Sequence, residues 1–66
     1  MANVLSIEEF APRAHRKLTA FGYKVTLEFV TEEAQRLASG QKPRSVIGMM
    51  MAAMLEQTEA TLTSTG

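Results

Sequence analysis

The 66-residue sequence predicts a small, mostly helical α+β domain with the element order helix, strand, helix, helix. Three observations support this fold class. Apolar residues recur with helical spacing near the start, one segment alternates with a two-residue period, and a later segment is apolar on all sides. A chain of this size buries only about 60% of the surface that its unfolded form exposes. A second copy is therefore the expected source of stability, and the protein is predicted to be a homodimer.

The first helix is predicted to follow a capping box, Ser6-Ile7-Glu8-Glu9. In this motif the Ser side chain accepts a hydrogen bond from an early backbone N–H, and the Glu reaches back. Apolar residues then recur at helical spacing, at Ile7, Phe10, Ala14, Leu18 and Phe21. Because Pro12 has no N–H to donate, we expect a short first turn, a kink near Pro12 and a helix to about Ala20. Gly22 is placed to end it.

Residues 23–30 form the only segment that is typical of a strand. Apolar and polar residues alternate there, with Val25, Leu27 and Phe29 on one face and Lys24, Thr26 and Glu28 on the other. A lone strand leaves its backbone groups unpaired, and the sequence offers no second strand. The same strand of another copy is therefore the expected partner. The alternative is a purely helical dimer in which residues 23–30 are an extended linker.

A short helix is predicted over residues 31–39. Thr31 can cap it, and the acidic pair Glu32 and Glu33 suits the positive end of the helix dipole. We expect a stop near Gly40 and a connector over residues 41–43. The last helix then begins at Pro43 or Arg44, or after Ser45 as its cap, and runs to about Thr61.

The last helix carries the strongest apolar signal. One stripe contains Ile47, Met50, Met51, Met54, Leu55, Thr58 and Leu62, and Val46, Met49, Ala52 and Ala53 occupy the other sides. A helix that is apolar on all sides must be covered on all sides, for which one chain has too little material. Gly48 and Ala52 would let another helix approach closely. The expected dimer core is Val25, Leu27, Phe29, Ile47, Met50, Met51, Met54 and Leu55, with Phe21 and Leu37 as further core residues.

We expect three parts in the chain: a helical extension over residues 1–22, a dimerisation domain over residues 23–62 and a flexible tail over residues 63–66. Composition narrows the classes of function. Seven basic and seven acidic residues give no net charge, and therefore no general attraction to nucleic acid or membranes. The absence of Cys and the single His predict neither disulfides nor a metal site, and no cofactor is expected.

The expected location is the cytoplasm. The longest apolar run, Val46 to Leu55, is ten residues long, whereas a membrane-spanning helix needs about 20. The first residues lack the positive and apolar regions of a signal peptide. No membrane partner is predicted.

Charge is unevenly distributed along the sequence. Residues 13–24 carry bases and no acid: Arg13, His15, Arg16, Lys17 and Lys24. Such a block is often simply a solvated face, and its functional interpretation is a surface for an anionic partner.

Catalysis is not predicted. The acidic pairs Glu8/Glu9 and Glu32/Glu33 are chain neighbours, and neighbours do not face each other on a helix. General acid–base catalysis needs groups that converge on one substrate. His15 stands alone among bases, and no glycine-rich phosphate loop is present. We therefore expect no catalytic residue and no small-molecule substrate.

Over about residues 23–58 the chain resembles the ribbon-helix-helix repressors. The resemblance is carried by Lys24-Val25-Thr26-Leu27-Glu28-Phe29, Thr31-Glu32-Glu33, Gly40, Pro43-Arg44-Ser45 and the helix from Val46. It implies an intertwined homodimer whose two strands pair antiparallel into a ribbon that enters the DNA major groove. It also implies that Lys24, Thr26 and Glu28 read base edges, as a ribbon in that groove can. Lys42, Arg44 and Ser45 would contact phosphates.

Two functions are therefore predicted. The first is a homodimeric, DNA-binding transcriptional repressor of a phage or plasmid. The alternative is a phage- or plasmid-encoded inhibitor that binds a host protein complex, such as an anti-defence or anti-CRISPR protein, and does not bind DNA. Zero net charge, the N-terminal helix and the Met cluster favour the alternative. Its candidate surface is Arg13, His15, Arg16 and Lys17.

Overall fold

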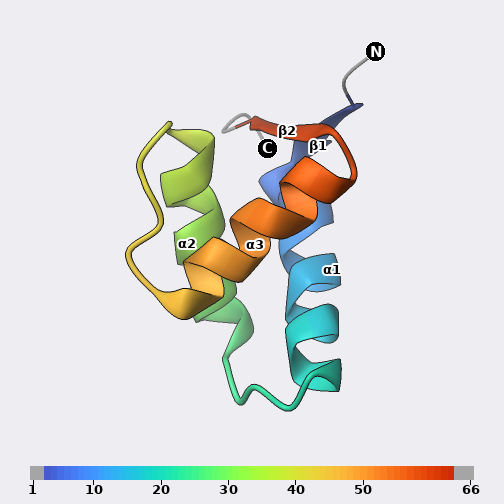
Figure 1. Ribbon diagram of the computed structural model, residues 1–66, viewed down its shortest axis with the longest axis vertical. Coiled ribbons are helices and arrows are strands. Elements are labelled where there is room, and N and C mark those ends of the chain that lie inside the picture. The colour runs from blue at the N-terminus through green and yellow to red at the C-terminus, as the bar shows by residue number, and fades with distance from the viewer. Residues whose placement is uncertain (1–2, 64–66) are drawn as a thin grey trace.

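The computed structural model describes residues 3–63, which form three helices and a two-stranded parallel sheet (Figure 1). The elements are β1 (Asn3–Ser6), α1 (Ile7–Ala20), α2 (Leu27–Ala38), α3 (Val46–Gln57) and β2 (Ala60–Thr63). Helices α1 and α2 run antiparallel, α3 crosses them, and the sheet lies at the end where α1 begins. The predicted α+β class is confirmed at this level, although the strands are not where the sequence pattern placed one.

The sheet joins the two ends of the described chain. Asn3 lies opposite Ala60 and Ser6 opposite Thr63 in parallel register. Neither strand was predicted, because each is only four residues long and is stabilised by a partner far away in the sequence. The last helix was predicted to reach Thr61 but ends at Gln57. The reason lies at Glu59, whose φ of 53° reverses the chain before β2. Of the predicted tail, residues 64–66 lie outside the described residues.

Helix α1 follows its sequence signals closely. The Ser6 hydroxyl accepts a hydrogen bond from the Glu9 backbone N–H at 3.2 Å, which confirms the predicted cap. The helix is continuous through Pro12, so the predicted short first turn is not a separate element. It ends at Ala20, and Gly22 follows with a φ of 96°, a conformation that glycine adopts without strain.

The strand predicted over residues 23–30 is wrong. Residues 23–26 have no regular structure, and the following residues form the first turn of α2. Thr26 ends the extended segment and caps the helix, because its hydroxyl accepts the Phe29 N–H at 3.0 Å. The alternative of an extended linker is therefore right for residues 23–26 alone. An intersubunit ribbon would require residues 27–30 to leave α2.

Replacing Thr26 by Ala is expected to lower the free energy of unfolding by about 1 kcal/mol, because the α2 cap is lost. Thr26→Asn should retain most of the stability, since Asn caps equally well. Urea unfolding followed by circular dichroism measures both variants. A strand would favour a β-branched apolar residue at this position. A Thr26→Val variant at least as stable as the natural protein would contradict the capping role.

One core joins all three helices and β2. Its buried apolar residues are Ile7, Phe10, Ala11, Ala14, Leu18, Val30, Ala34, Met51 and Leu62. Helix α1 thus supplies much of the cover that was expected from a second copy. Among the predicted core residues, Met51 is fully buried, whereas Val25, Leu37, Ile47, Met50, Met54 and Leu55 are partly buried against the core.

Three predicted core positions are more open. Phe21 is 64% exposed and Leu27 is 47% exposed, because both lie at the turn between α1 and α2. Phe29 is half-buried on α2. The assignment of Leu27 and Phe29 to the core depended on the strand, whose inner face does not exist in this structure. Phe21 was assigned from helical spacing, but it lies just beyond the last residue of α1. No helix within residues 3–63 combines the length and the apolar character that crossing a membrane requires.

Candidate functional site

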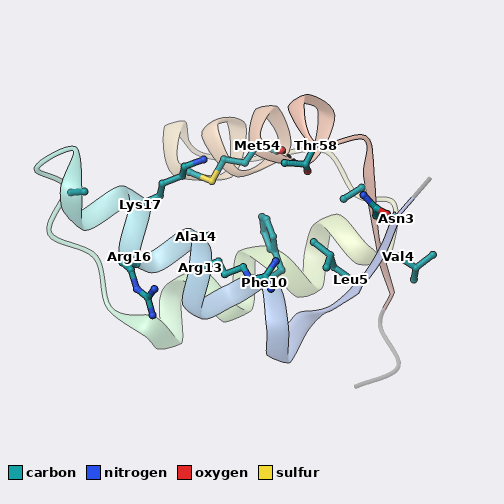
Figure 2. Close-up of a pocket in the computed structure, with 12 residues that line it drawn as sticks. Asn3, Val4, Leu5, Phe10, Arg13, Ala14, Arg16, Lys17, Met54 and Thr58 are labelled. Carbon is teal, nitrogen blue, oxygen red and sulfur yellow. Dashed lines mark hydrogen bonds between the residues drawn. The ribbon is translucent and has the colours of Figure 1, made fainter. Parts of the chain in front are cut away.

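A groove of about 840 Å³ lies between α1, α3 and the strands (Figure 2). Its apolar lining is Val4, Leu5, Phe10, Ala14, Ala20, Met54 and Ala60, and its remaining lining residues are Asn3, Arg13, Arg16, Lys17 and Thr58. The lining thus combines a mainly apolar surface with three cations and no acidic residue. This combination suits a ligand that is both apolar and negatively charged.

Helix α1 has one apolar face, and Phe10, Ala11, Ala14 and Leu18 are all buried on it. Phe10 and Ala14 lie on the side of this face that also lines the groove. The C-terminal end of α3 lies near the start of α1, and its other end lies over α2 (Figure 1). The second half of α1 is consequently not covered by α3, and the space beside it is the groove.

The three cations of the groove come from one helix. Arg13, Arg16 and Lys17 are exposed, and in the described part of the chain none of them forms an ion pair. Lys17 extends toward Met54 on α3, whereas Arg16 points to the other side of α1 (Figure 2). The charge of Lys17 is therefore free to meet an anionic group of a ligand at the edge of the apolar surface, whereas Arg16 adds to the positive potential from the far side of α1.

His15 does not join this cluster, although the sequence analysis grouped it with the other three. The side chain is half-buried, and its Nε2 donates a hydrogen bond to the Val25 carbonyl oxygen at 2.9 Å. Because a carbonyl oxygen only accepts, this contact sets the tautomer. His15 thus fixes the linker between α1 and α2 against α1.

The predicted base-reading residues do not share a strand face. Lys24 is exposed on the linker, Thr26 is the α2 cap, and Glu28 is exposed in the first turn of α2. These three residues alternate with apolar residues in the sequence, but the structure does not place them together on the face of a ribbon.

The predicted phosphate site is occupied by a carboxylate of the same chain. Glu33, which is 1% exposed, accepts hydrogen bonds from Arg44 Nε and from the Ser45 hydroxyl, both at 3.1 Å. The Ser45 hydroxyl in turn accepts the Gly48 N–H at 3.1 Å, as a cap of α3. Lys42 is exposed nearby in the chain. Arg44 and Ser45 therefore hold α2 against the start of α3.

The cations of the groove were predicted from the sequence as a candidate surface, but its apolar residues were not. Phe10 and Ala14 were assigned to the single apolar face of α1, and Met54 to a dimer core. Leu5 and Ala60 lie on the two unpredicted strands. The signal that was available is the spacing of Phe10, Ala14 and Lys17, which places a cation on the same helix face as two apolar residues.

Within residues 3–63 no group of three or more His, Cys, Asp or Glu side chains is arranged to hold a metal ion. Comparisons of the chain with protein-family models, with curated proteins and with solved structures found no significant match. The resemblance to ribbon-helix-helix repressors is therefore carried only by the residues named above.

Proposed function

We propose that this protein is a protein-binding module whose α1–α3 groove holds an acidic, apolar segment of a partner protein. The observation that carries the proposal is the lining of the groove, which combines apolar side chains with Arg13, Arg16 and Lys17 and contains no acid. An amphipathic peptide helix with acidic residues beside its apolar face is complementary to both features.

A function of this kind fits an inhibitor of a host protein complex better than a repressor. A small chain can block a larger assembly by occupying the surface where one of its helices normally docks. The repressor hypothesis depended on a ribbon over residues 23–30, and those residues are a linker and a helical turn. Duplex DNA would meet the three cations but offers no apolar group of matching size to the groove. The experiment below therefore also measures binding of a DNA duplex.

The test uses a fluorescein-labelled synthetic helix with Leu on one face and Glu beside it. Its binding, measured by fluorescence anisotropy, is expected to weaken about tenfold in the variant Lys17→Glu. An exposed ion pair contributes roughly 0.2–1 kcal/mol, and reversing the charge replaces this attraction by a similar repulsion. Lys24→Glu is the matched control, because Lys24 is exposed on the linker and does not line the groove.

The apolar part of the groove needs a variant of its own. Met54→Gln replaces an apolar side chain of the groove wall by a polar, uncharged one of similar size and should weaken binding of the peptide, with the circular dichroism of the variant unchanged. A version of the peptide with Gln in place of Glu should bind more weakly and with less dependence on salt. Equal binding to the natural protein and to both groove variants would refute the proposal. So would salt-sensitive binding of a labelled DNA duplex in place of the peptide.

A further inference from the structure

Helix α3 has an apolar stripe that the other residues of the described range, 3–63, leave uncovered. Val46 is 61% exposed and Met49 is 60% exposed, and Ala53 is also exposed one turn further on. The three residues lie at positions i, i+3 and i+7, which places them on one face of the helix. Half-buried Met50 and Ala52 flank this stripe. No residue from Val46 to Leu55 is charged.

The stripe differs from the groove in the partner that it suits. The groove carries cations, whereas the stripe offers only apolar contact along its first two turns. Gly48 is not part of it, because the position where a Cβ would lie is 3.0 Å from Glu33 Oε1 and 3.3 Å from Pro43 Cβ. The groups that approach Gly48 closely are therefore Glu33 and Pro43 of the same chain. The outer face of α3 is left for another molecule.

We infer that the stripe of Val46, Met49 and Ala53 is the contact surface of a homodimer, in which α3 packs against α3 of a second copy. Charge complementarity selects this occupant. Glu56 lies at the C-terminal end of the same face, and Arg44 precedes the N-terminal end. In an antiparallel pair, Glu56 of each copy meets Arg44 of the other copy. The Nε of Arg44 is bonded to Glu33 of its own chain, but the side chain is 54% exposed and can meet a second carboxylate. One two-fold contact thus matches apolar residues with apolar residues and places opposite charges together at both ends.

The structure also indicates how strong such a dimer is. Helix α3 has 12 residues and is therefore about 18 Å long. A stripe of this length buries less than the roughly 800 Å² per partner of a standard interface, so the dimer is weak and depends on concentration. Met51 and the inner face of α3 are covered within one chain, so each copy keeps its core when the pair separates. An intertwined dimer would not behave in this way.

Sedimentation over a series of concentrations tests the inference. The natural protein should change from the 7.2 kDa of one chain toward twice that mass as concentration rises. Met49→Glu should weaken association by at least about tenfold, since the two-fold contact contains each substitution twice. Ala53→Glu is the second variant, and it preserves helix propensity. Phe21→Glu is the matched control, because Phe21 is as exposed as Met49 but lies at the turn between α1 and α2.

A mass that remains 7.2 kDa up to about 1 mM protein would overturn the inference. So would a dimer that survives both Met49→Glu and Ala53→Glu, or one that only Phe21→Glu dissociates. Circular dichroism should show that both α3 variants stay folded, and their unfolding on dissociation would indicate an intertwined dimer instead. Peptide binding in the groove is measured separately, so failure of the dimer leaves the proposed function untouched.

Discussion

Replacing Met51 by Glu is expected to unfold the protein. Met51 has no exposed surface and lies on the inner face of α3, in the core that α1, α2 and β2 share with it. Removing such a side chain costs about 2–5 kcal/mol through lost contacts and the resulting cavity. An unpaired carboxylate in the same position adds the free energy of its dehydration, which amounts to several kcal/mol more.

The total stability available is small. At roughly 0.05–0.15 kcal/mol per residue, a chain of 66 residues has about 3–10 kcal/mol in all. The expected result is therefore a loss of the cooperative thermal transition in circular dichroism. Met49→Glu is the matched control, with the same chemical change on the same helix but at an exposed position. A cooperative transition in Met51→Glu close to that of Met49→Glu would contradict the packing of α3 described above.

The elements that sequence reasoning located correctly are those whose signals are local. The Ser6 cap and the helical spacing that follows it lie within one segment, and α1 begins and ends where they indicate. The prediction of a strand over residues 23–30 failed because seven residues that alternate between apolar and polar fit both a strand and the start of a helix. The decisive residue was Thr26, whose hydroxyl stabilises the helix by capping it. A cap and a β-branched strand residue cannot be told apart from composition.

The remaining features depend on contacts between distant segments. Strands β1 and β2 are four residues each and pair across almost the whole chain. The sequence therefore contains no local pattern that would identify them. The groove also depends on contacts between distant segments, because its apolar residues come from α1, α3 and both strands. Only its cations form a visible block in the sequence. Sequence reasoning could thus find the charge of the site and not its shape.

Glu33 illustrates a further limit, because charged residues are almost never fully buried unless they are paired. From the sequence, Glu33 was predicted to lie in the first turn of a helix over residues 31–39. The structure buries it among partners that lie 11 and 12 residues away along the chain. This contact decides where α3 starts, and the Glu33 carboxylate also lies at the positive end of the α3 dipole.

Glu33→Lys is accordingly the second substitution with a large expected effect. It places a cation beside Arg44 and the positive end of α3, in a site that is 1% exposed. Loss of one partner of a buried ion pair lowers the free energy of unfolding by about 3–5 kcal/mol. Because the Arg44 side chain is half exposed and water can solvate it, the loss here is nearer about 1–3 kcal/mol. Burial of the new charge raises the cost again, so the variant should be largely unfolded at room temperature.

The neighbouring residue provides the control for this substitution. Glu32 is exposed on the same helix, so Glu32→Lys makes the same charge change and should alter the free energy of unfolding by no more than about 0.5 kcal/mol. Glu33→Gln, which keeps the shape and one acceptor, should lie between the two. Urea unfolding of the three variants gives this order directly. Equal stability of Glu33→Lys and Glu32→Lys would mean that Glu33 does not hold α2 against α3, and the orientation of α3, on which both the groove and the stripe depend, would then have to be different.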